Sequence, residues 1–223
     1  MAAGDTYIVS DLHLGSAYFR HESFLRFLRE LPEGVRLVLN GDTIDDPADP
    51  LPPEHEQVLH RLVEESSRRP VVFIYGNHDE GFGLDEPGGI EFVHRLTVDG
   101  RLLVVHGDKL DGVMPRHPWF IAAFRRFHRL RVRLGLEDVH VAHYAKSWRF
   151  LYRVLNEHVA HHALDTARAQ GLPAITCGHT HAPMELEHDG RRYLNTGAWT
   201  EEPHHYVAVS GGRIELRVYP NGA

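Results

Sequence analysis

The sequence has one cysteine among its 223 residues and no long apolar run. The single cysteine, Cys177, excludes an internal disulfide, and one free thiol is typical of proteins in a reducing compartment. No stretch approaches the roughly 20 apolar residues that a bilayer-spanning helix needs. The apolar run Thr6–Val9 is too short to be the core of a secretory signal. We therefore expect a cytoplasmic protein.

The chain also lacks an excess of basic residues, because 31 Asp and Glu outnumber 24 Lys and Arg and give a net charge of −7. A chain that is acidic as a whole is not built to bind polyanions, so no nucleic-acid partner is expected. The 42% hydrophobic content suits a soluble globular core. The length fits a single domain over residues 1–223.

Short apolar runs alternate with amphipathic or polar stretches along most of the chain. Helical spacing of apolar residues predicts a helix over 22–31, and a polar-faced helix follows over 54–69. The tail over 191–219 alternates and favours antiparallel strands. Continuous apolar runs predict strands buried on both faces, at residues 7–10, 35–39, 71–75, 102–105 and 174–177. The pattern indicates an α/β (α+β) class with a mixed sheet or two sheets.

Five short histidine and aspartate motifs each follow one of these predicted strands. They are Asp11-Leu12-His13, Gly41-Asp42-Thr43-Ile44-Asp45, Gly76-Asn77-His78-Asp79, His106-Gly107-Asp108 and Gly178-His179-Thr180-His181. Their carboxylate, imidazole and amide groups are ligands for hard or borderline divalent metals. We predict two such ions, with manganese favoured and iron, zinc or magnesium as alternatives. The candidate ligands are Asp11, His13, Asp42, Asn77, His106, His179 and His181.

Spacing within the motifs supports a shared site. In an extended segment, residues two apart lie on one face, so Asp11 and His13 could converge on one ion, as could His179 and His181. Loops that follow adjacent strands meet where open α/β sheets usually bind ligands. Glycine accompanies the motifs, as expected where backbones crowd around a buried ion pair.

In their order and spacing these motifs resemble the calcineurin-like metallophosphoesterase superfamily, whose pattern is D-x-H, G-D-x-x-D, G-N-H-[DE], H and G-H-x-H. The resemblance spans Asp11 to His181 with no motif missing. It implies a two-sheet sandwich flanked by helices. It also implies two metal sites that share a bridging Asp42. One is completed by Asp11, His13 and His181, and the other by Asn77, His106 and His179.

The same resemblance assigns a hydrolytic mechanism. A hydroxide held between two ions attacks phosphorus in line, and the ions hold the phosphoryl oxygens. The histidine equivalent to His78 protonates the leaving oxygen or stabilises the transition state, and a carboxylate at the position of Asp45 orients it. Such a pairing would raise the pKa of His78.

Residues 112–171 differ from the rest, because they have no strand pattern and are predicted to form two or three helices. Residues 116 to 153 include nine Lys or Arg but only two acidic residues, and eight aromatic residues are interleaved with the basic ones. We interpret the segment as a helical cap insertion. Basic and aromatic helices suit an interface between anionic headgroups and acyl chains, and so a peripheral contact with the inner face of a membrane. The alternative is a solvated helical hairpin whose aromatics fill its own core.

A closer resemblance is to the UDP-2,3-diacylglucosamine pyrophosphatase branch of the superfamily. It rests on Ser10–Leu14, on the His106 and Gly178 motifs, on Asn195–Trp199 and on the insertion. It implies a phosphorylated, lipid-linked substrate in lipid A synthesis, with acyl chains received by the cap. Lys146 and Ser147 are candidate substrate contacts, since the branch has Lys and Ser in this part of its cap.

One pair of residues departs from that branch, which has Arg where this chain has His78 and Glu where it has Asp45. The two residues here match the general superfamily instead. Another phosphomonoester, phosphodiester or nucleotide therefore stays open as the substrate. A non-catalytic scaffold is the remote alternative, because such proteins should have lost ligands and here the set is complete.

Overall fold

The structure is a computed structural model that describes residues 4–111 and 149–220. Lys146, Ser147 and most of the predicted insertion over 112–171 lie outside the described residues. Within the described ranges, no helix is both long enough and apolar enough to cross a membrane.

The first sheet has six strands and joins the beginning of the chain to its end. The strands lie in the order β11 (Arg213–Val218), β10 (His205–Ser210), β1 (Thr6–Val9), β2 (Arg36–Asn40), β3 (Val71–Ile74) and β4 (Ile90–Val93). Strands β1 to β4 pair in parallel, whereas β10 pairs antiparallel with β1 and with β11. The antiparallel pair of β10 and β11 confirms the antiparallel strands predicted for the last part of the sequence.

The second sheet has five strands, with parallel pairs in its centre and antiparallel pairs at both edges. Their order is β5 (Leu96–Val98), β6 (Leu102–Val104), β7 (Ala174–Cys177), β9 (Arg191–Asn195) and β8 (Met184–His188). Strands β6 and β7 are neighbours although about 70 residues separate them in sequence, so the chain leaves this sheet after β6 and returns to it at β7.

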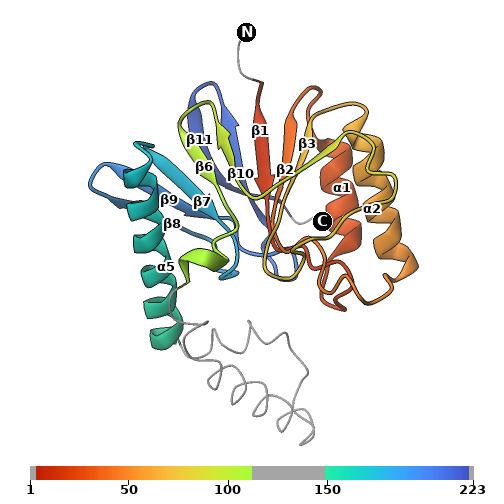
Figure 1. The fold of residues 1–223 in the computed structure, drawn as a ribbon, viewed down its shortest axis with the longest axis horizontal. Coiled ribbons are helices and arrows are strands. Elements are labelled where there is room, and N and C mark those ends of the chain that lie inside the picture. Colours follow the sequence, from red (N-terminus) through yellow and green to blue (C-terminus); the bar gives the residue numbers. More distant parts are fainter. Residues whose placement is uncertain (1–3, 112–148, 221–223) are drawn as a thin grey trace, which may run out of the picture.

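The central strands of the first sheet are buried on both faces, which explains their continuous apolar sequence. On β2, Leu37 and Leu39 pack toward helices α1 (His21–Glu30) and α2 (Pro53–Ser66), whereas Val38 packs toward the second sheet. This alternation has the period of two that a strand requires. Figure 1 shows the resulting layers, with α1 and α2 outside one sheet. The predicted two-sheet sandwich flanked by helices is confirmed.

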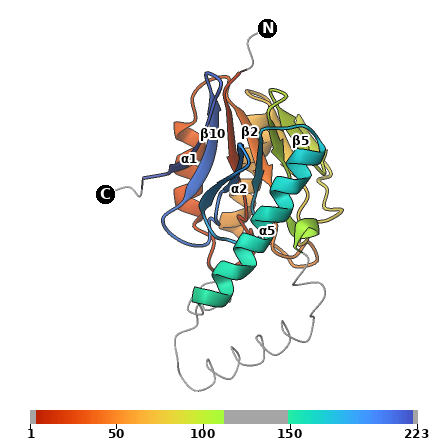
Figure 2. The same cartoon turned by 90° about the vertical axis from the view of Figure 1, so that its left-hand side faces the viewer.

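Helix α5 (Arg149–Ala169) covers the outer face of the second sheet (Figure 2). Its small buried residues Ala160, Ala163 and Ala167 allow close approach to Ile175 and Tyr193. This helix lies inside the segment that was predicted as a cap. Because it packs on the second sheet, the part of that segment over 149–169 forms the outermost layer of the sandwich. The predicted cap function of the segment stays a prediction.

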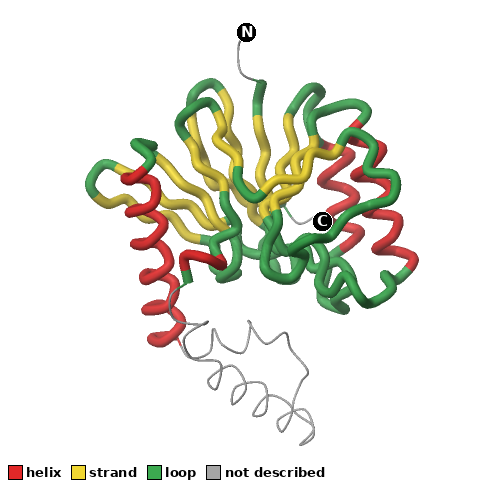
Figure 3. The backbone as a smooth tube through the Cα atoms, viewed as in Figure 1, coloured by secondary structure: helices red, strands yellow, loops and turns green. Residues whose placement is uncertain are grey.

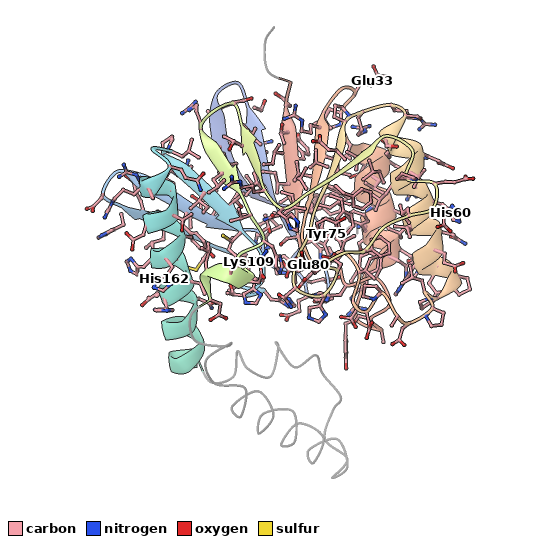
Figure 4. All side chains as sticks on the ribbon, viewed as in Figure 1. Glu33, His60, Tyr75, Glu80, Lys109 and His162 are labelled. Carbon is pink, nitrogen blue, oxygen red and sulfur yellow. The ribbon has the colours of Figure 1, made fainter. Side chains whose placement is uncertain are left out.

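The parallel strands of both sheets end at one edge of the sandwich. Figure 3 shows the loops gathered there, and the short 3₁₀ helix η1 (Asp108–Leu110) lies among them. In Figure 4, Glu80 and Lys109 are labelled at this edge, whereas Glu33 lies at the opposite one. All five motifs fall in these loops, so the fold brings together residues from distant parts of the sequence.

Candidate metal centre

The backbone of the motif loops bends sharply where the ligands are. Five candidate ligands have a positive φ, between 50° and 64°. Among the other non-glycine residues of the described ranges, only Asp99 and Asp189 share this region, and each of these two stands directly before a glycine. Left-handed backbone costs a non-glycine residue on the order of 1–3 kcal/mol. The five are Asp11, His13, Asp42, His179 and His181. The predicted extended conformation was wrong, because the backbone of these residues is left-handed. The expected convergence of His179 and His181 on one ion was also wrong, because the two histidines lie in different ligand groups.

The first ligand group joins the loop after β1 to the loop after β7. Potential ligand atoms of Asp11, His13 and His181 all lie within 4.8 Å of one another, and the three residues are at most 7% exposed. The Nδ1 of His13 donates to Asp45 Oδ1 at 2.8 Å, so the Nε2 lone pair points inward. That Nε2 lies 3.2 Å from Nε2 of His181. Two imidazole nitrogens facing each other beside a carboxylate fit a bound cation.

The second group consists of Asp42, His106 and His179, again with ligand atoms within 4.8 Å. The Nδ1 of His106 donates to the carbonyl oxygen of Asn40 at 3.0 Å, and its Nε2 lies 3.2 Å from Asp42 Oδ2. This buried Nε2 has no partner other than Asp42 among the described residues. An inward-facing imidazole nitrogen beside a carboxylate, fixed by an acceptor on its far side, fits a metal ligand.

Asn77 and Asp42 extend this arrangement. The Oδ1 of Asn77 lies 3.1 Å from Nδ1 of His179, which places the amide beside the second group. Asp42 also lies within 4.8 Å of ligand atoms of His13 and His78 in a further group. The structure therefore brings all seven predicted ligands together, with Asp42 between the two groups.

The charges of the site favour bound cations. Burial opposes ionisation of Asp42, but the attraction of His106 is stronger and lowers the pKa of Asp42 well below its usual value. Burial would lower the pKa of His106, yet Asp42 and then Asp11 raise it to about 10. In the metal-free protein a proton on His106 thus offsets part of the negative charge of Asp42 and Asp11. A divalent ion would replace that proton, since metal ligands must be deprotonated.

Two glycines let the carboxylates approach the neighbouring backbone. A Cβ on Gly76 would lie 2.2 Å from Oδ1 of Asp42, and a Cβ on Gly178 would lie 2.2 Å from Oδ2 of Asp11. Neither distance is compatible with a side chain. The expected crowding of backbones around the ligands is confirmed at these positions.

His78 lies at the open side of the site, with its side chain 39% exposed. Its Nδ1 donates to the backbone oxygen of Asp45 at 2.7 Å, and Oδ1 of the same residue is 3.7 Å away. The Asp45 carboxylate lies closer to His13, at 2.8 Å. Asp45 therefore contacts both histidines, and its contact with His13 was not predicted.

Two further carboxylates were not singled out from the sequence. Asp79 is fully buried, and its oxygens accept hydrogen bonds from the backbone of Thr43, Ile44 and Gly76, which ties two ligand loops together. Asp79 was visible as the last residue of its motif, but its partners depend on the fold. Asp111, which lies 3.2 Å from Nε2 of His179, belongs to no motif and offered no such signal.

Comparison with known proteins gives three findings. The calcineurin-like phosphoesterase family profile matches residues 5–183. The chain is 28% identical over 247 residues to a UDP-2,3-diacylglucosamine hydrolase of Shewanella halifaxensis, with 97% of this chain and 99% of the relative covered. Among solved structures, a phosphoesterase from E. coli is 15% identical with a TM-score of 0.47, covering 93% of this chain and 88% of that one.

Proposed function

The chain belongs to the calcineurin-like phosphoesterase family and is a phosphoester hydrolase, and we propose that its substrate is UDP-2,3-diacylglucosamine. The bond to be cut is the pyrophosphate P–O bond, and two divalent metal ions are required. One observation carries the choice of substrate. The similarity to the Shewanella hydrolase extends over nearly the whole length of both chains, beyond the region that the family profile matches.

The two ligand groups support the proposed metal requirement. Asp11, His13 and His181 would hold one ion and Asn77, His106 and His179 the other, with Asp42 contributing to both. When bound, such a pair of ions lowers the pKa of a water molecule and offsets charge on phosphoryl oxygens. The geometric support is the inward-facing nitrogens of His13 and His106, each fixed by an oxygen acceptor on its far side.

His78 is the proposed general acid. Its Nδ1–H is held by the carbonyl oxygen of Asp45, so the protonated ring can donate from Nε2. The oxygen of water would bond to phosphorus and one proton of that water would pass to solvent, while the bridging P–O bond breaks and the departing phosphate oxygen takes the proton from His78. Solvent would then return a proton to His78. The products would be UMP and 2,3-diacylglucosamine 1-phosphate. The partial exposure of His78 is consistent with this role, because a leaving group has to reach it from outside.

The proposal for the acyl chains rests on the sequence of residues 112–171. Nine basic and eight aromatic residues between 116 and 153 suit contact with acyl chains and anionic headgroups. Lys146 and Ser147 remain predicted substrate contacts, and a peripheral contact with an anionic membrane through this segment remains a prediction. Manganese as the favoured metal also remains a prediction from the sequence.

The test is hydrolysis measured with one metal at a time, using manganese, iron, zinc and magnesium. UDP-2,3-diacylglucosamine in mixed micelles would be compared with UDP-N-acetylglucosamine, which lacks the second acyl chain and has only a short first one. We expect kcat/KM to be at least about 100-fold higher for the lipid, because contacts with the acyl chains contribute to catalysis. Equal activity on the two nucleotide sugars would refute the lipid substrate.

The His78 and Asp45 pair favours a second candidate, which is hydrolysis of another phosphomonoester, phosphodiester or nucleotide. The pyrophosphatase branch has Arg and Glu at these positions, so the acid of this chain resembles that of the wider superfamily. Under this alternative, simple diesters such as bis(p-nitrophenyl) phosphate would be cut as efficiently as the lipid. The same set of assays therefore separates the two candidates.

A further inference from the structure

Asp111 directly follows the 3₁₀ helix η1 and lies five residues after the candidate ligand His106. It is 7% exposed, and its Oδ2 lies 3.2 Å from Nε2 of His179. We propose that Asp111 is a positioning residue, which holds the proton of His179 on Nε2 and so presents Nδ1 to the metal. The inference rests on the proposed metal-dependent function and adds a residue outside all five motifs.

The two nitrogens of His179 face different partners. Nδ1 lies 3.1 Å from Oδ1 of Asn77, and Nε2 faces Asp111. If the proton of the neutral ring were on Nδ1, the Nε2 lone pair would face a charged carboxylate, and two acceptors repel each other. With the proton on Nε2, His179 donates to Asp111, and the Nδ1 lone pair faces the uncharged Asn77 oxygen, so the weaker of the two repulsions remains. A cation bound by both Nδ1 and the Asn77 oxygen would relieve it.

Two other histidines of the site show the same organisation. His13 donates from Nδ1 to the Asp45 carboxylate, and His106 donates from Nδ1 to the Asn40 carbonyl. In each ring the nitrogen opposite the acceptor faces the candidate ions. His179 is reversed, with Nε2 on the acceptor side and Nδ1 inward, and Asp111 supplies the acceptor. Oxygen acceptors behind metal-bound imidazoles fix the tautomer and commonly change metal affinity 10–100-fold on mutation.

Helix α5 holds the turn that carries Asp111. Within the turn, Leu110 donates its backbone N–H to Gly107 and Asp111 donates to Asp108. His162 of α5 donates from Nδ1 to the carbonyl oxygen of Leu110 at 3.1 Å. Figure 4 labels His162 on α5 and Lys109 on η1. The outer helix of the second sheet thereby restrains the residue next to Asp111.

The experiment compares Asp111→Ala with Asp111→Glu and with the control Asp108→Asn. Asp108 lies in the same turn, and within the described residues its side chain contacts no candidate ligand, so its replacement tests a loss of charge alone. Manganese binding would be measured by calorimetry and by metal analysis, without substrate. For Asp111→Ala we expect affinity for one of two ions to fall about 10–100-fold, with partial recovery in Asp111→Glu and no change in Asp108→Asn.

The tautomer gives an independent readout. Nitrogen-15 NMR of the histidine side chains, assigned with His179→Gln, should show His179 protonated on Nε2 in the metal-free protein and a mixture of tautomers in Asp111→Ala. An unchanged tautomer and unchanged binding of both ions in Asp111→Ala would overturn the proposal. Neither readout needs the substrate, so failure of the proposed function leaves this result interpretable.

Discussion

The two ligand groups differ in how far they are closed off from solvent. The side chains of Asp11, His13 and His181 are at most 9% exposed. In the second group His106 and Asp42 are equally buried, but the side chain of His179 is 13% exposed and Asn77 is exposed. His78, at 39%, lies on the same open side. We predict from this difference that the first group holds an ion inside the protein and that the second group meets the substrate.

The closed group is enclosed by backbone as well as side chains. Trp199 donates its backbone N–H to the carbonyl of Asp11, and Ser10 donates its hydroxyl to the Asp11 carboxylate. His179 adds its own backbone N–H to that carboxylate at 3.1 Å. Loops of both sheets therefore contact Asp11, and substrate has no comparable access to it.

The largest effect is expected at Asp42, the carboxylate that lies between the two groups and is proposed to serve both ions. Asp42→Ala should lower hydrolysis by at least about 10³-fold, because it removes charge that both ions need. Metal analysis after dialysis should show that both sites bind more weakly. Asp49→Ala, an exposed carboxylate in the loop over 47–53, is the control. Retention of hydrolysis in Asp42→Ala would refute the shared ligand.

His78→Ala separates the role of the open side from metal binding, because it should change only the open side. We expect kcat to fall about 10²–10⁴-fold, the usual range for a general acid. Both ions should remain bound, since His78 is not among the seven proposed ligands. Kinetics with metal analysis on the same sample test this prediction. Loss of an ion would show that His78 is itself a ligand, and unchanged kcat would remove it from the mechanism.

A smaller effect is expected behind the closed group, at Gly178. Gly178→Ala should lower the free energy of unfolding by about 1–3 kcal/mol through overpacking against Asp11. Gly83→Ala is the matched control, because a Cβ there meets nothing within 4 Å and its φ is not positive. Denaturant unfolding of the metal-free proteins measures both. Equal stability of the two variants would contradict the close contact.

The last prediction concerns pH. The neighbouring carboxylates raise the pKa of His106 to about 10, so its proton stabilises the metal-free fold fully below the unfolded pKa of about 6.5. This stabilisation is lost as pH rises through about 10. The thermal midpoint of the metal-free protein should therefore fall more between pH 7 and 10 than that of the metal-loaded protein. Parallel decline of both forms would contradict the prediction.

The sequence predicted the strands that are buried on both faces, because continuous apolar runs leave few alternatives. Strands β4, β5 and β8 were not predicted. They lie at the edges of the sheets, and exposed residues such as Glu91, Thr97 and Glu185 interrupt their apolar pattern. Helix α5 was predicted as part of a cap, since an amphipathic sequence does not say which surface its apolar face will cover.

For the site, the ligand types and their order were predictable because each motif carries its own chemistry. The left-handed backbone at five of the ligands was not, since it arises from contacts between loops such as that of Asp11 with Gly41. The acceptors behind the histidines were equally hidden. Asp111 and the Asn40 carbonyl become partners only when separate strands end at the same edge.

The most direct test of the two-group account is a manganese titration of the metal-free protein, with hydrolysis and bound metal measured on the same samples. We expect two ions per chain. Hydrolysis should appear only as the second, open site fills, and Asn77→Ala should weaken that site alone. Full hydrolysis with one ion bound, or with none, would contradict the presence of two cooperating metal sites.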